Sequence, residues 1–220
     1  MSMERAVKLL IFDLDGTLVN AYRAVALSLN HALTHNGYGR LDDQMIKRSV
    51  GWGEKVLVEK FVRAEDVDQV LSVYRHHHKI ALKSGTRFLP GVKKAIGGFR
   101  SQGYLMAVAT NRPSAFTRII LNHLGVFDFF CAVVCADQVA RPKPEADVLW
   151  EILARTKLAQ EESIYVGDMA LDVETGRKAG IRTVSVLTGS CTKEEILAQR
   201  PYRLIGAMEE LDTVLKELEK

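Results

Sequence analysis

A short apolar segment, Val7 to Phe12, most constrains what this chain can fold into, because Lys8 is its only polar residue. The segment is too short and too continuously apolar for an amphipathic helix, whereas it suits a strand that is buried on both faces. Strands of this kind lie inside parallel sheets, where helices cover both faces. The sequence therefore predicts that this segment is the central strand of a parallel sheet.

Similar apolar runs recur along the chain, and helical patterns lie between most of them. These runs cover residues 105–109, 132–135, 163–166, 183–187 and 202–205. Strands that alternate with helices are typical of α/β proteins in which helices pack on both faces of one sheet. We therefore expect an α/β protein with a Rossmann-like, doubly wound parallel sheet.

One long stretch interrupts this alternation. Residues 20–84 contain three or four helical patterns and no convincing strand. The sequence therefore predicts an α/β core of residues 1–19 and 85–220, with a helical cap of residues 20–84 inserted after the first strand. The chain would leave and re-enter the core at two adjacent crossings, which would act as a hinge.

Composition and charge exclude several classes of protein. The chain has 220 residues, of which 47% are hydrophobic and 26% charged, as in ordinary globular proteins. Its 30 basic and 27 acidic side chains leave a net charge of +3, too small and too dispersed to indicate nucleic-acid binding. No apolar stretch approaches the roughly 18 residues of a membrane helix, and no signal peptide is recognisable. We expect a cytoplasmic protein that binds neither nucleic acid nor membrane.

Two clusters of potential metal ligands are interpreted as structural. Cys131 and Cys135 would lie about 13 Å apart in a strand, too far for a disulfide, and the C-x3-C spacing lacks a second pair. We expect both to be buried packing residues. In the run His76 to His78, consecutive helical side chains point about 100° apart and cannot share one ion. We expect His77 and His78 to continue an apolar stripe, with His76 exposed.

Two aspartates follow the first strand, in IFDLDGTLV. Asp13 and Asp15 are one residue apart, so a continuing strand would place both on one side, where two anions repel each other. Gly16 and Thr17 follow at a point where the backbone must turn. A hard divalent cation such as Mg²⁺, which prefers oxygen ligands, would relieve the repulsion. The motif therefore predicts a magnesium site.

Further polar clusters fall where other predicted strands end. They are Thr110 and Asn111 in VATNRP, Lys143 in RPKPEADVL, and Asp168 with Asp172 in YVGDMALDV. Because parallel strands end at one edge of a sheet, these clusters and the first aspartates should meet there. Carboxylates with a metal, hydroxyl and amide donors and one lysine suit phosphoryl transfer. No serine or cysteine has a base nearby in the sequence, so an aspartate is the natural covalent nucleophile.

These motifs resemble the haloacid dehalogenase superfamily, and within it the phosphoglycolate phosphatase-like enzymes with a small helical cap. The resemblance covers nearly the whole chain, through DLDGTLV, PGVKKAIGGFRSQGYLMAVATNRP, the lysine of RPKPEADVL, GDMALDVETGRKAG and the terminal helices. It implies a Mg²⁺-dependent phosphomonoester hydrolase that forms an aspartyl phosphate. The implied substrate is a small soluble phosphate ester, with 2-phosphoglycolate as the leading candidate, and we expect a monomer or a homodimer.

The resemblance also implies a role for each matching residue. Asp13 would be the nucleophile and a Mg²⁺ ligand, and Asp15 would be the general acid and base and lend its carbonyl oxygen to the metal. Asp168 would complete the metal ligands, and Asp172 would support the site by ligation or by hydrogen bonds to Lys143 and metal-bound waters. The phosphate group would be bound by Asp13, Gly16, Thr110, Asn111 and Lys143.

Other activities stay open. The same branch contains β-phosphoglucomutase-like phosphomutases, pyrophosphatases and sugar-phosphate phosphatases; Thr17 favours a phosphatase, because mutases of this kind often carry valine there. A dehalogenase or a phosphonate hydrolase is disfavoured because Asp15 is retained. A non-enzymatic phosphate-binding scaffold is the remaining alternative, and the complete set of aspartates and lysine argues against it.

Substrate selection is expected from the segment SVGWGEK in the insert. Gly51 and Gly53 allow a turn that would push Trp52 toward the site, with Arg48 and Lys55 nearby to meet a substrate carboxylate. In the alternative interpretation, Trp52 only anchors the small core of the insert.

Overall fold

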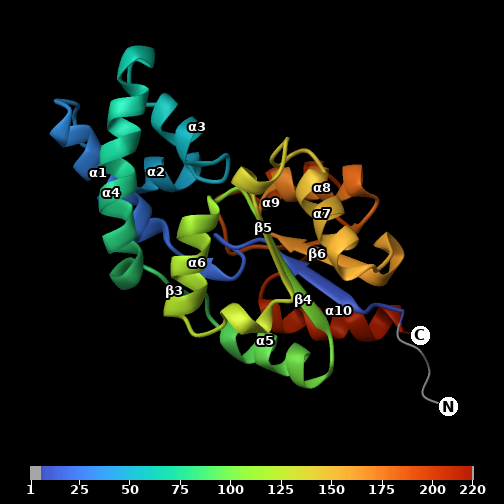
Figure 1. Cartoon of the computed structure of the whole chain (residues 1–220). Coiled ribbons are helices and arrows are strands. Elements are labelled where there is room, and N and C mark those ends of the chain that lie inside the picture. Colours follow the sequence, from blue (N-terminus) through green and yellow to red (C-terminus); the bar gives the residue numbers. More distant parts are fainter. Residues whose placement is uncertain (1–5, 220) are drawn as a thin grey trace.

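The computed structural model describes residues 6–219, and a six-stranded parallel sheet lies at its centre (Figure 1). The strand order is β5-β4-β1-β6-β7-β8, so β1 lies between β4 and β6 as the predicted central strand. The predicted α/β doubly wound fold is confirmed, with each expected strand within two residues of its observed bounds. These bounds are Leu9–Phe12 (β1), Leu105–Thr110 (β4), Ala132–Cys135 (β5), Ser163–Gly167 (β6), Arg182–Val186 (β7) and Arg203–Ile205 (β8).

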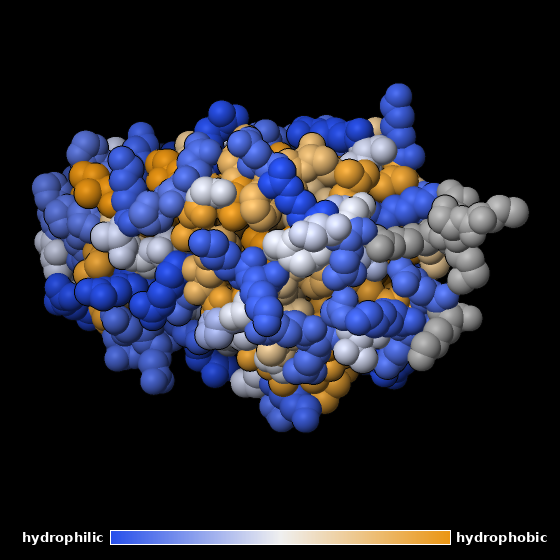
Figure 2. Space-filling view, turned by 90° about the horizontal axis from the view of Figure 1, so that it is seen from below, coloured by the Kyte–Doolittle hydropathy of each residue, from blue (hydrophilic) through white to orange (hydrophobic). Residues whose placement is uncertain are grey.

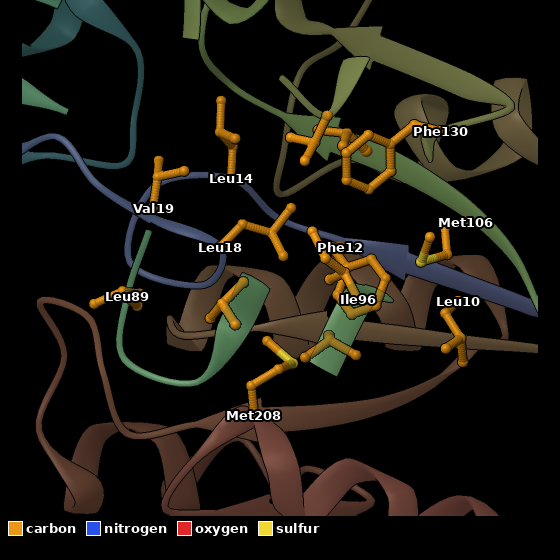
Figure 3. Packing of buried hydrophobic residues seen from close by; sticks show 14 of the residues in the cluster. Leu10, Phe12, Leu14, Leu18, Val19, Leu89, Ile96, Met106, Phe130 and Met208 are labelled. Atoms are coloured by element: carbon orange, nitrogen blue, oxygen red, sulfur yellow. The ribbon is translucent and has the colours of Figure 1, made fainter. Parts of the chain in front are cut away.

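Helices cover both faces of this sheet. One face carries α5 (Val92–Ser101), α6 (Ser114–His123) and α10 (Leu211–Leu218), and the other carries α7 (Asp147–Thr156) and α8 (Ala170–Ala179). Side chains of a strand alternate between its two faces, so Leu10 and Phe12 join the first layer while Leu9 and Ile11 join the second. Figure 3 shows Phe12 beside Ile96, with Met106 and Met208 in the same apolar layer. A short helix, α9 (Lys193–Ala198), follows β7.

Four helices inserted after β1 form a separate group beside the sheet, at the left of Figure 1. We call this group the cap. Its helices are α1 (Tyr22–His35), α2 (Asp43–Ser49), α3 (Glu54–Glu59) and α4 (Val67–Gly85). They surround their own apolar cluster, which includes Leu29, Leu33, Ile46, Val70 and Tyr74. Figure 2 shows hydrophilic side chains over most of the cap end of the molecule on the face seen from below.

Two short strands mark the place where the chain leaves and re-enters the core. β2 (Val19–Asn20) and β3 (Arg87–Phe88) pair in antiparallel fashion, so the two crossings lie side by side. Packing is continuous near this point, because Ala24 of α1 and Leu82 of α4 belong to the apolar layer of the core. The cap is therefore attached through a two-stranded connection and the adjacent ends of two helices.

Several smaller features complete the fold. Short 3-10 helices cover Ala64–Asp66, Phe127–Phe129, Ala136–Gln138, Gln160–Glu162 and Met208–Glu210. Cys135, at the end of the edge strand β5, is buried as expected. The expected burial of Cys131 is wrong, because this residue lies directly before β5, outside the paired strand, and its side chain is exposed; both thiols are free. Within the described residues, no helix combines the length and the apolar character that crossing a membrane requires.

Candidate active site

The first part of the candidate site is the end of β1 and the turn that follows it. The backbone N–H of Asp13 still donates to the carbonyl of Val166 on β6 (2.8 Å), so the carboxylate is held at the end of a paired strand. Gly16 follows with φ +88°. A Cβ atom at Gly16 would lie 2.5 Å from Asp168 Oδ2, so only glycine fits both the backbone conformation and this close approach. Its N–H donates to the carbonyl of Val19 within the turn (2.8 Å), and the role of Gly16 in phosphate binding stays a prediction.

Lys143 joins two of the predicted aspartates. Its Nζ donates to Asp13 Oδ1 (2.6 Å) and to Asp172 Oδ1 (2.7 Å), and all three residues are buried. Burial would lower the pKa of Lys143, but the two carboxylates outweigh it and hold that pKa well above its usual value. The lysine is therefore a fixed positive charge beside Asp13.

Tyr165 of β6 is a site residue that sequence reasoning missed. Its hydroxyl donates to Asp172 Oδ1 (2.7 Å) and lies 3.1 Å from Lys143 Nζ. The other carboxylate oxygen of Asp172 accepts from the backbone N–H of Met169 (3.0 Å). Both oxygens of Asp172 are thus used within the protein, which suits the supporting role rather than ligation. The only sequence signal was a tyrosine in the middle of an otherwise apolar strand.

Asp168 carries an unpaired oxygen in the middle of this cluster. Its Oδ1 accepts from Thr17 Oγ1 (2.8 Å), but its buried Oδ2 has no hydrogen-bond partner among residues 6–219. The carboxylate is enclosed closely, since a Cβ atom at Gly189 would lie 1.6 Å from Oδ2. A buried carboxylate oxygen in such a setting requires a cation or a donor.

The balance of charge also indicates a cation. Asp13, Asp168 and Asp172 each offer an oxygen within 4.8 Å of the others, whereas Lys143 is the only cation bound to this group in the described chain. Burial is the largest effect on Asp13 and raises its pKa to about 7, although Lys143 opposes part of this rise. Burial together with Asp13 and Asp172 raises the pKa of Asp168 well above its usual value. A divalent cation between Asp13 and Asp168 would neutralise the excess negative charge, and these oxygens suit Mg²⁺.

The next strand end supplies Thr110 and Asn111. Asn111 Nδ2 donates to the carbonyls of Lys143 (3.0 Å) and Gly51 (3.1 Å), and its Oδ1 accepts from the Lys143 backbone N–H (2.9 Å). Asn111 therefore connects the end of β4 to two other segments through hydrogen bonds: the loop that contains Lys143 and the cap loop that contains Gly51. Thr110 Oγ1 accepts from the backbone N–H of Arg112 (3.1 Å), and Thr110 lines the pocket described below.

Arg112 is a second residue that sequence reasoning missed, although it stands inside VATNRP. Its Nε and Nη2 donate to the two carboxylate oxygens of Asp15 at 2.7 and 2.9 Å, and the arginine is buried. A two-point contact of this kind fixes the orientation of a carboxylate. Asp15 is therefore held by Arg112, while Asp13 is held by Lys143.

The same arginine reaches into the cap. Arg112 Nη1 lies 2.7 Å from Nε2 of His78, a fully buried residue of α4. Arginine can only donate, so His78 must accept at Nε2 and carry its proton on Nδ1, which lies 3.0 Å from Ser28 Oγ. Of its neighbours, His76 is exposed and His77 is half-buried, in keeping with the sequence analysis.

The buried His78 should make the protein sensitive to acid. Burial, with a smaller contribution from Arg112, lowers the pKa of His78 to about 2, whereas an unfolded histidine has a pKa near 6.5. The contribution of neutral His78 to the free energy of unfolding is present above pH 6.5 and is lost as pH falls. Below that pH the histidine is protonated in the unfolded chain but stays neutral in the folded chain, which favours unfolding. Between pH 7 and pH 5 this loss is about 2 kcal/mol.

We expect urea unfolding to show this difference. The unfolding free energy of the wild type should fall between pH 7 and pH 5 by about 2 kcal/mol more than that of His78→Gln. His76→Gln, on the exposed face of the same helix, should follow the wild type. Equal pH dependence of the wild type and His78→Gln would contradict the neutral, buried state of His78.

A pocket opens between the cap and these side chains. The core contributes its polar wall with Asp13, Asp15, Thr110, Asn111, Arg112 and Lys143. The opposite wall is mixed: the cap contributes Tyr22, Val25, Val50, Gly51, Gly53, Glu54, Leu57 and Tyr74, and the core adds Pro113, Phe116 of α6 and Met169. The structure thus brings Asp13, Asp15, Thr110, Asn111 and Lys143 into one cavity. Asp168 and Asp172 do not line it, but each has a carboxylate oxygen within 4.8 Å of one from Asp13.

The three cap side chains predicted for substrate selection are placed differently. Trp52 is 46% exposed, Arg48 pairs with Glu195 of α9 (3.4 Å), and Lys55 lies 3.9 Å from Glu59. The pocket-lining residues of the described chain do not include Trp52, Arg48 or Lys55, although they include both glycines that flank the tryptophan. A role for these three side chains in substrate selection stays a prediction.

Known proteins resemble this chain in sequence and in fold. Residues 10–186 match the family model of haloacid dehalogenase-like hydrolases. The chain is 31% identical to a phosphoglycolate phosphatase of Mesorhizobium japonicum over 216 residues, which cover 95% of each protein. It is 28% identical to a phosphoglycolate phosphatase of Yersinia pseudotuberculosis over 204 residues, covering 90% of this chain and 88% of that protein.

Among solved structures, the fold is similar to that of a "predicted phosphoglycolate phosphatase" from Haemophilus somnus. The TM-score is 0.90 at 23% sequence identity, with 97% of this chain and 99% of the other covered. At this identity the likeness establishes the fold.

Proposed function

Because the chain belongs to the haloacid dehalogenase-like hydrolase family, we propose that it is a Mg²⁺-dependent phosphomonoester hydrolase with Asp13 as the nucleophile. One observation carries this proposal. Asp13, held at the end of β1 by Lys143 at 2.6 Å, lies near the buried Asp168, whose Oδ2 has no hydrogen-bond partner in the described part of the chain. This arrangement combines a positioned nucleophile, a positive charge and a vacant ligand atom, as phosphoryl transfer requires.

Asp13 and Asp168 would hold Mg²⁺, and family resemblance adds the backbone carbonyl of Asp15. When bound, the cation would neutralise phosphate oxygens and carboxylates that otherwise repel one another. Asp172 would remain with Lys143 and Tyr165, whose contacts already occupy its oxygens.

The chain's own residues account for the two chemical steps. A carboxylate oxygen of Asp13 forms a bond to phosphorus while the bond to the ester oxygen breaks, and Asp15 donates a proton to that leaving oxygen. In the second step water attacks phosphorus, Asp15 takes its proton, and the bond to Asp13 breaks. Lys143 keeps Asp13 in place, and Arg112 orients Asp15 through its two hydrogen bonds.

The cap supports a small substrate. Its loop reaches the core through the hydrogen bond from Asn111 to the Gly51 carbonyl, and His78 reaches Arg112 from α4. A pocket that the cap covers in this way excludes bulk water and suits a small ester better than a polymer. As part of this proposal, we expect the protein to be cytoplasmic and to be a monomer or a homodimer.

Phosphate release from a panel of esters tests the proposal. The purified protein with Mg²⁺ should release phosphate from an aryl phosphate and, with higher kcat/KM, from at least one small metabolite ester. The names of the relatives put 2-phosphoglycolate first on this panel. No release from any member would contradict the proposal and favour a phosphate-binding scaffold.

A further inference from the structure

One carboxylate of the cap faces the pocket and has no part in the two chemical steps. Glu54 begins α3, lines the pocket, and has a side chain that is only 8% exposed. Its Oε1 accepts from Arg75 Nε at 2.5 Å. Its Oε2 is buried and has no hydrogen-bond partner among residues 6–219. A buried carboxylate oxygen without a donor is energetically costly, and a donor from a ligand would satisfy it.

The cations that line the pocket are already paired with carboxylates of the core. Lys143 is bound to Asp13 and Asp172, and Arg112 is bound to both oxygens of Asp15. A substrate carboxylate near Glu54 would therefore find no free positive charge among these pocket-lining residues. The two carboxylates would repel each other. A hydroxyl or an ammonium group would instead give Glu54 Oε2 its missing partner.

Electrostatics at Glu54 agree with this geometry. Burial raises the pKa of Glu54, and the neighbouring Arg75 and Arg112 offset this effect only in part. A donor placed beside Oε2 would stabilise the ionised carboxylate further.

We propose that Glu54 selects phosphate esters whose alcohol part carries a hydrogen-bond donor, either a hydroxyl or a protonated amine, and disfavours esters that carry a carboxylate. This inference rests on the proposed function, since Glu54 meets the alcohol part only when the phosphate lies beside Asp13. It also ranks 2-phosphoglycolate below hydroxylated or amino esters of similar size.

The experiment compares the wild type with Glu54→Gln and Glu59→Gln. Glu59 lies on the same helix, is exposed, and is outside the pocket, so its variant changes the charge of α3 equally. The substrates are glycerol 1-phosphate, phosphoethanolamine, 2-phosphoglycolate and an aryl phosphate, with kcat and KM measured for each at pH 7.5. Melting temperatures confirm that each variant is folded.

In the wild type, kcat/KM should be higher for a donor-bearing ester than for 2-phosphoglycolate. Glu54→Gln should lower kcat/KM for that ester about 10- to 100-fold, mainly through KM, because a hydrogen bond to a charged group is lost. It should raise kcat/KM for 2-phosphoglycolate and reduce that for the aryl phosphate much less. A larger loss with phosphoethanolamine than with glycerol 1-phosphate would identify an ammonium group, and the reverse a hydroxyl. Glu59→Gln should resemble the wild type throughout.

Two outcomes would overturn the inference while leaving the proposed function intact. One is an equal change in kcat/KM for all four esters in Glu54→Gln, and the other is a wild-type preference for 2-phosphoglycolate that Glu54→Gln weakens. Failure of every protein to hydrolyse even the aryl phosphate would instead overturn the proposed function, and the inference with it.

Discussion

Asp13→Asn should lose turnover by on the order of 10³-fold or more, because an amide of nearly the same shape cannot attack phosphorus. The loss should appear in kcat for every ester of the panel, since every substrate uses the same nucleophile. Steady-state phosphate release from an aryl phosphate measures it. Retention of more than a few per cent of wild-type activity would contradict the assignment of Asp13.

The same variant should remain folded. Asp13 is one of three buried carboxylates near a single lysine, and burial, with a smaller contribution from Asp172 and against the opposing effect of Lys143, raises its pKa to about 7. Removing one negative charge from this group relieves repulsion, so in excess chelator the variant should melt at or above the wild-type temperature. A much lower melting temperature would mean that lost activity reflects unfolding, and the conclusion about the nucleophile would fail.

Removal of Mg²⁺ is expected to have a comparably large effect. Excess chelator should reduce phosphate release to background, and added Mg²⁺ should restore it, because Asp13 and Asp168 otherwise face a phosphate without sufficient positive charge. Ca²⁺ should not replace Mg²⁺ and should inhibit, since its larger and looser coordination sphere would misplace the reacting oxygens. Full activity in excess chelator would rule out this requirement.

Metal binding can be measured apart from turnover. A ligand that binds only the folded state stabilises it by an amount that grows with the logarithm of its excess over Kd, so Mg²⁺ should raise the melting temperature of the wild type. Asp168→Asn, which alters the carboxylate with the unpaired oxygen, should lose most of this stabilisation. Undiminished stabilisation by Mg²⁺ in that variant would show that the cation binds elsewhere.

The sequence predicted the sheet and the grouping of its polar strand ends for the same physical reason. Parallel strands buried on both faces are continuous apolar runs, and their carboxyl ends share one edge. Once the strand containing Ile11 and the one containing Tyr165 are recognised, Asp13 and Asp168 must lie near each other. The burial of Cys131 was predicted wrongly, because this residue lies directly before β5 and outside the paired strand, whereas Cys135 at the end of the same strand is buried.

Contacts between the cap and the core could not be predicted from local patterns. Arg112 needs Asp15 from one segment and His78 from another, and no spacing in the sequence relates the three. In the cap loop, the expected turn is present, with φ +119° at Gly51 and +93° at Gly53. With these dihedral angles Trp52 is exposed and Glu54 lies at the pocket; the glycines predict the turn, but not which side chain the turn directs toward the pocket.

The position of β1 has a consequence for how the chain is made. β1 precedes the other described strands, yet it pairs with β4 and β6, which begin only at Leu105 and Ser163. During synthesis the apolar side chains and both edges of β1 stay exposed until β4 and β6 have been made. In contrast, α1 and α4 of the cap can pack on each other much earlier. The strand that leads into Asp13 is thus open to aggregation through its unpaired edges while the protein emerges from the ribosome.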